Sequence, residues 1–188
     1  MSSFPSGAER VDFTALPQYV LLMYKTIAEF VDDWTKESAI TLKVLQALTD
    51  ASLKQKSDAA GNTLGKLSWD MAVMLGVTGT AVGFEVAAPA RGTEPPNSTR
   101  VMADAYQTAA QSMSEQASKK LKDEQLSSGV SHYGRTLPMA TVLSGLIRHQ
   151  IHHRGQMTIL MRQAGVVVPG VYGPSREETA AMRARQKV

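Results

Sequence analysis

Apolar residues recur three or four positions apart along most of this 188-residue chain, and that spacing constrains the fold more than any other feature. The stripes occupy four segments, residues 20–48, 64–84, 98–126 and 138–164. The first could also be two helices with a break near Trp34. Strand signals are nearly absent, because no Asn-Gly or Asp-Gly turn lies between alternating stretches, and residues 127–136 are expected to form a loop. The pattern therefore predicts an all-α protein, a four-helix bundle.

Composition excludes several function classes. The chain has no cysteine, which rules out disulfides, cysteine-type zinc sites, iron–sulfur clusters and thiol chemistry from its own side chains. The longest uncharged stretch, Met71–Phe84, is shorter than the roughly 18 apolar residues of a membrane span, and the N-terminus lacks an export signal, so we expect a cytoplasmic protein without a membrane partner. Twenty Lys and Arg against seventeen Asp and Glu leave too small an excess to indicate a nucleic-acid partner.

The sequence divides into three expected parts. Residues 1–27 are expected to be an N-terminal arm with the start of the first helix, residues 28–178 the bundle, and residues 179–188 a charged C-terminal tail. Gly76 and Gly79 lower the helix propensity of the second helix, and close helix–helix contact is the expected compensation. Gly165 is predicted to end the fourth helix.

Three of the four histidines cluster in the fourth helix, and two of them have ligand spacing. His149 and His153 are one turn apart on the stripe that also carries Leu146 and Met157, so both rings should point inward. Two imidazoles on one helical face can bind one metal ion, although a hydrogen-bonded core pair would have the same spacing. His152 is rotated by about 100° from His153 and is the weaker candidate.

Asp70 lies inside the apolar stripe of the second helix, where a carboxylate is costly unless it meets a cation. Its partner could be an arginine or a helix N-terminus. If the second and fourth helices pack side by side, however, Asp70, His149 and His153 would supply one oxygen and two nitrogens to a single ion. Coordination positions would then stay open, as in catalytic metal sites, and the donor set suits zinc, nickel, iron or manganese.

The remaining polar residues carry weaker signals. Arg148, Arg154 and Arg162 are best explained as a solvated face of the fourth helix, since no aromatic or recognition-helix pattern accompanies them. His132, in the loop before that helix, is expected to be solvated, although its loop could reach the mouth of a site. No serine-hydrolase elbow or dinucleotide-binding glycine motif occurs.

The chain resembles the DinB-like superfamily, on the motif His149-Gln-Ile-His-His153-Arg-Gly-Gln156. Two following stretches match as well, Arg162-Gln-Ala-Gly165 and Val168-Pro-Gly-Val-Tyr172-Gly, and Thr63-Leu-Gly-Lys-Leu-Ser-Trp69-Asp70 matches more loosely. The resemblance covers about residues 28–178. It implies an up-down four-helix bundle with a long crossover connection, a homodimer and a divalent ion, most often nickel or zinc.

The family pattern also implies the ligand set, with one departure. Two ligands carry over to His149 and His153, whereas the third, a histidine directly after the tryptophan of the second helix, is Asp70 here. An aspartate can ligate, but it changes the charge balance and the metal preference of the site.

Three functions follow as hypotheses. The leading one is a thiol-dependent S-transferase or isomerase that acts on a small electrophile, with a low-molecular-weight thiol as cosubstrate because the chain has no cysteine. The second is a metal-dependent hydrolase of a small molecule. The third is a non-catalytic, stress-induced protein of the DNA-damage-inducible type. Beyond the three candidate ligands, the sequence assigns no catalytic residue.

Overall fold

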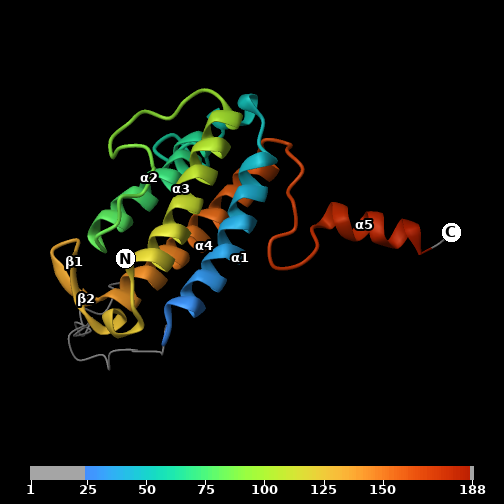
Figure 1. The fold of residues 1–188 in the computed structure, drawn as a ribbon. Coiled ribbons are helices and arrows are strands. Elements are labelled where there is room, and N and C mark those ends of the chain that lie inside the picture. Colours follow the sequence, from blue (N-terminus) through green and yellow to red (C-terminus); the bar gives the residue numbers. More distant parts are fainter. Residues whose placement is uncertain (1–23, 187–188) are drawn as a thin grey trace, which may run out of the picture.

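The computed structural model describes residues 24–186 (Figure 1). Its elements, in chain order, are α1 (Ile27–Gln46), the 3-10 helix η1 (Asp50–Lys54), α2 (Leu64–Ala81), α3 (Thr99–Lys120), the 3-10 helix η2 (Asp123–Ser127), β1 (Gly129–His132), β2 (Arg135–Pro138), α4 (Met139–Gln163) and α5 (Arg176–Arg185). The fold is mostly helical, as predicted, with one small two-stranded sheet. Most of the arm expected at residues 1–27 lies outside the described residues. Within residues 24–186, no helix is both long and apolar enough to cross a bilayer.

Hydroxyl side chains fix where the long helices begin. Thr26 accepts a hydrogen bond from the backbone N–H of Glu29, whose carboxylate accepts from the N–H of Thr26 in return. The hydroxyls of Thr63 and Ser98 cap α2 and α3 by accepting from the backbone N–H groups of Lys66 and Val101, without the reciprocal bond. Such caps contribute about 1 kcal/mol each. They set the helical phase, and therefore which residues of each helix face the core.

The four long helices pack around one core. In this arrangement α1 contacts α3 and α4, and α2 contacts α3 and α4 (Figure 1). The largest fully buried side chains include Phe30, Trp34, Leu64, Met71, Tyr106, Leu143 and Met157. α1 continues unbroken through Trp34, whose indole N–H donates to the carbonyl of Ala110 on α3 at 3.0 Å. The packing of α2 beside α4 is the condition on which the predicted metal site depended.

The glycines of α2 serve a different contact from the one predicted. A Cβ on Gly79 would collide with Cγ2 of Val86, and one on Gly76 would lie 3.1 Å from Cβ of Ala88. Both neighbours belong to the connector after α2, not to another helix. The expectation of close helix–helix contact was therefore wrong at these positions: the glycines let the chain fold back along α2.

The segment predicted as a loop between the third and fourth helices is a 3-10 turn followed by a hairpin. α3 ends at Lys120, earlier than expected, and β1 pairs antiparallel with β2 in the register Val130 opposite Leu137. Tyr133 and Gly134 form the two-residue turn with φ of 48° and 72°. A two-residue hairpin turn needs positive φ, which is uncommon for a tyrosine, so the Tyr-Gly pair gave little turn signal in the sequence.

The C-terminal segment, where a charged tail was expected from residue 179, contains a further helix. Gly165 ends α4 with φ of 72°, as predicted, and Ser175 then caps the further helix, α5. Glu177, in its first turn, pairs with Arg162 of α4. The remainder of α5 projects away from the other helices (Figure 1), and none of its residues is buried in the described part of the chain.

Candidate metal centre

α4 presents His149 and His153 on one face, next to the buried side chains of Leu146 and Met157. The two Nε2 atoms are 3.0 Å apart. His152, one residue away, is exposed, and its ring lies against that of His153, with 5.2 Å between the ring centroids, but it is not among the three residues whose ligand atoms converge. The i, i+4 spacing thus brings two ring nitrogens to one point.

Asp70 completes the group from α2. Its Oδ2 lies 3.6 Å from Nε2 of His149 and 3.6 Å from Nε2 of His153, and the three ligand atoms lie within 4.8 Å of one another. In a tetrahedral site with metal–ligand distances near 2.0–2.1 Å, ligand atoms are about 3.3 Å apart. The separations of 3.0 and 3.6 Å bracket that value. The residues present therefore fit a metal ion that takes two nitrogens and one oxygen.

The site is open to small molecules. The side chains of His149, His153 and Asp70 keep 28, 16 and 40% of their surface exposed. A closed structural site would bury all its ligands and fill its coordination sphere from protein, whereas a three-ligand site with exposed side chains leaves room for water or substrate. This geometry matches the pattern of catalytic sites.

Burial keeps His149 in the form that a metal requires. Desolvation lowers the pKa of His149, the neighbouring ring of His153 lowers it further, and the carboxylate of Asp70 opposes both effects. The neutral imidazole is thereby favoured, and only the neutral ring can ligate. His149 is also under-satisfied, because its Nδ1 is buried with no hydrogen-bond partner among residues 24–186.

Gln156 orients the second ring. Its Oε1 lies 2.8 Å from Nδ1 of His153. A carbonyl oxygen can only accept, so this contact favours a proton on Nδ1 of His153, and the other ring nitrogen, Nε2, which faces Asp70 and His149, would then be the ligand atom. Partners of this kind usually hold metal-binding histidines in place. Gln156 belongs to the matched motif, but spacing alone gave it no role.

Gln150 fixes the register of α2 against α4 at the same level. Its amide donates to the carbonyl of Met71 at 3.3 Å and accepts from the hydroxyl of Tyr106 on α3 at 3.0 Å. Because Met71 follows Asp70 and Gln150 follows His149, one buried amide ties together the two helices that carry the candidate ligands. A glutamine in a helix resembles any polar surface residue, so the sequence did not reveal it.

The hairpin lies beside the site. The hydroxyl of Tyr133 is 3.8 Å from Sδ of Met74, which is one helical turn after Asp70 on α2. His132 is half-buried and stacks edge-on against Tyr133. His132 is thus only partly exposed, and it is not among the three residues whose ligand atoms converge.

Arg154 corrects the prediction of a solvated basic face. Only 1% of its side chain is exposed, and it pairs with Glu37 of α1. Its guanidinium also donates to the carbonyl of Glu37 and to Oγ1 of Thr41, both at 2.9 Å, and to the hydroxyl of Tyr172, which in turn donates to Glu37 at 2.8 Å. A buried charge needs such partners. They come from α1 and the segment after α4, far away in the sequence.

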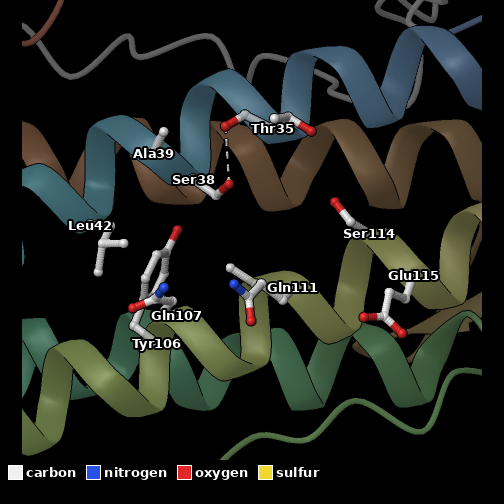
Figure 2. A pocket seen from close by; sticks show the side chains of 10 residues that line it. Thr35, Ser38, Ala39, Leu42, Tyr106, Gln107, Gln111, Ser114 and Glu115 are labelled. Carbon is white, nitrogen blue, oxygen red and sulfur yellow. Dashed lines mark hydrogen bonds between the residues drawn. The ribbon is translucent and has the colours of Figure 1, made fainter.

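A large cavity between α1 and α3 is separate from the candidate metal centre, which lies between α2 and α4. It has a volume of about 580 Å³ (Figure 2). Figure 2 shows Tyr106, Gln107 and Gln111 of α3 opposite Thr35 and Leu42 of α1. None of the three candidate ligands lines it, so its size does not make it the chemical centre.

Comparisons with known proteins find a matching family model, a relative in sequence and similar solved structures. A family model described as "DinB family" matches residues 23–187. "Uncharacterized protein YrdA" of Bacillus subtilis (strain 168) is 38% identical over 158 residues, which are 84% of this chain and 95% of that protein. The crystal structure of a DinB-like protein from Bacillus cereus ATCC 10987 has a TM-score of 0.76 at 38% identity, covering 79% of this chain and 99% of that one. A DinB-like protein of Bacillus subtilis, YjoA, has a TM-score of 0.60 at 14% identity, with coverage of 76 and 97%, which is a similarity of fold.

Proposed function

The chain belongs to the DinB family, and on that premise we propose that it is a divalent-metal-dependent enzyme whose ion is held by Asp70, His149 and His153. The observation that carries the proposal is the convergence of these three ligand atoms from α2 and α4 at separations of 3.0–3.6 Å. The exposed side of the triad supports catalysis over a purely structural role.

We favour the transfer of a small thiol to a small electrophile, written R–SH + R′–X → R–S–R′ + HX. When bound, the ion would lower the pKa of the thiol and supply positive charge beside the leaving group. His149 and His153 contribute neutral nitrogens, and Gln156 holds the ring of His153 in the ligating tautomer. Asp70 contributes negative charge. No cysteine of the chain can act as the nucleophile, so the thiol is a cosubstrate.

The metal preference depends on Asp70. Zinc and nickel are the ions that we favour, since two of the three ligands are imidazoles. Iron and manganese are alternatives, because a carboxylate in place of a third imidazole makes the donor set more favourable to harder ions. Asp70→His restores the family's nitrogen ligand. It should tighten zinc and nickel binding relative to manganese in competition titrations. Unchanged ratios of the zinc and nickel affinities to the manganese affinity would show that Asp70 is not a ligand.

Turnover measurements test the reaction type. Untagged protein is assayed with 1-chloro-2,4-dinitrobenzene as the electrophile, with and without 2-mercaptoethanol and with and without added zinc or nickel. We expect product formation that needs both the metal and the thiol, and that is lost in His149→Ala and His153→Ala but kept in His152→Ala. Metal-dependent release of chloride without thiol would replace the transferase by a hydrolase, and no metal-dependent turnover of either kind would favour a non-catalytic protein.

The assembly, topology and location form a further part of the proposal. We propose a homodimer, an up-down bundle with a long crossover connection, and a cytoplasmic location. The packing supports a crossover, since α1 and α2, which follow one another in the chain, both pack on α3 and α4 more than on each other; the same is true of α3 and α4, which pack on α1 and α2. The dimer is supported by the small side chains of Ser38, Ala39 and Ser114 along the α1–α3 face, which would permit close approach of a second copy. Sedimentation equilibrium at micromolar concentration tests the dimer.

A further inference from the structure

A second, smaller cavity lies next to the candidate metal centre, in the same groove between α2 and α4. Its volume is about 290 Å³. It is lined by Leu67 of α2, by Gln156, Ile159 and Leu160 of α4, and by Gly61 and Asn62 of the loop before α2. Ligand pockets begin at about this size, so the occupant must be small.

The helical positions place this cavity directly beside the triad. Leu67 is one turn before Asp70 on α2, and Gln156 is one turn after His153 on α4. One turn of helix advances about 5.4 Å, so the cavity starts roughly that far from the ligand atoms on both walls of the groove. Gln156 belongs to both places, because it lines the cavity and also accepts from the ring of His153.

The lining indicates the chemistry of the occupant. Leu67 and Leu160 are buried aliphatic walls, and Ile159 is an aliphatic side chain with 61% of its surface exposed at the rim. The polar groups that line it are neutral, namely the hydroxyl of Ser57 and the amides of Asn62 and Gln156, and no ionisable side chain takes part among the lining residues of the described chain. Away from the triad, where an ion would supply positive charge, an ionised group in the cavity would lack a counter-charge, which is costly. An uncharged molecule with an apolar part fits.

We infer that this cavity, which we call the Leu67–Leu160 pocket, binds the apolar part of the enzyme's small electrophilic substrate, and that the part of the substrate held there is uncharged. The inference rests on the proposed function, since it is the adjacent triad that gives the pocket its chemistry. The larger cavity lies between α1 and α3, and none of its lining residues belongs to α2 or α4, the helices that carry the candidate ligands.

Two probes of equal size and different charge test this inference. Zinc-loaded protein is titrated with benzyl alcohol and, separately, with benzylammonium, and the methyl resonances of Leu67, Ile159 and Leu160 are followed by NMR. We expect saturable shifts with benzyl alcohol and an affinity at least roughly tenfold weaker with benzylammonium, since its ammonium group finds no carboxylate among the lining residues and is repelled by the neighbouring ion. Equal binding of benzylammonium, or no saturable shift with benzyl alcohol, would overturn the inference.

A matched pair of variants locates the binding. Ile159→Glu puts a carboxylate at the rim, while Ile151→Glu puts one on the same helix at a residue that is also exposed, at 39%, and does not line the pocket. Benzyl alcohol affinity should fall roughly tenfold or more in Ile159→Glu and less than about twofold in Ile151→Glu, because only the first carboxylate is desolvated by the probe. Similar losses in both variants, or none in either, would contradict the assignment.

The same samples separate failure of the pocket from failure of the metal site. Zinc content is measured in parallel, and both variants should retain it. If the unsubstituted protein holds zinc but does not bind benzyl alcohol, the pocket assignment is wrong and the proposed function still stands. If it binds benzyl alcohol but holds no zinc, the proposed function is wrong, and so is the inference that the pocket receives a substrate.

Discussion

His153 and Arg154 are consecutive residues of α4, yet their side chains enter opposite kinds of environment. Arg154 is almost fully buried between α1 and α4, and its two terminal nitrogens find Glu37, Thr41 and Tyr172. His153 faces α2, together with His149 and Asp70, in a group that stays partly open to solvent. The first region is a charge network with internal partners. The second has ligand atoms that converge but leave coordination to be completed.

The difference shows how stability and function can be separated along one helix. A buried ion pair is costly to break, because the remaining charge has no solvent, whereas a partly exposed metal site contributes little to folding before its ion binds. We therefore expect substitutions at Arg154 to act on the free energy of unfolding, and substitutions at the histidines to act on metal binding. The predictions below test this division, beginning with the largest effect.

Arg154→Met should lower the free energy of unfolding by about 3–5 kcal/mol, because the carboxylate of Glu37 remains buried with a hydroxyl as its main partner. Urea denaturation monitored by circular dichroism measures this loss. The double variant Glu37→Leu/Arg154→Met removes both charges and should recover most of the stability. A double variant as unstable as the single one would mean that Arg154 stabilises the protein by packing and not by neutralising Glu37.

Gln156→Leu should weaken zinc binding by roughly tenfold to a hundredfold, the usual consequence of removing the partner of a ligating histidine. The change removes the acceptor for Nδ1 of His153 at an exposed position, so the free energy of unfolding should change little. Competition with a chromophoric chelator measures the affinity. Gln156→Glu keeps an acceptor and should retain tight binding; equal losses in both variants would assign Gln156 to packing alone.

Much of this organisation follows from local pattern. The helices, the pair His149 and His153, and the inward position of Asp70 could all be predicted, since each depends on a periodicity of three to four residues within one helix. The burial of Arg154 could not be predicted, because its partner Glu37 lies 117 residues away and an arginine in a helix resembles a surface residue. The hairpin at Tyr133 was missed because a tyrosine with positive φ is rare.

The smallest effect concerns the exposed ion pair between Arg162 and Glu177. Arg162 lies on α4, eight residues after Arg154, and Glu177 lies on α5. Hydrogen bonding to Arg162 lowers the pKa of Glu177 to about 2. Because the folded-state pKa lies below the ordinary value of 4.5, the pair supports the docking of α5 above that pH and loses its effect as the pH falls toward 2.

Amide hydrogen exchange across residues 176–185 should therefore quicken, relative to α4, as the pH falls from 6 to 3, once the intrinsic pH dependence of exchange is corrected. The change should be smaller than any effect at Arg154, since surface pairs contribute little. Glu177→Gln should flatten this dependence, and an identical pH profile in that variant would assign the docking to Glu178 and its partners instead.

Elemental analysis of untagged, zinc-equilibrated protein tests the central claim most directly, that two neighbouring helices bring a carboxylate and two imidazoles to one ion. The account predicts one equivalent of metal per chain in the unsubstituted protein and in His152→Ala, and none in His149→Ala or His153→Ala. Full metal content in both of the latter variants, or no bound metal in the unsubstituted protein, would contradict it.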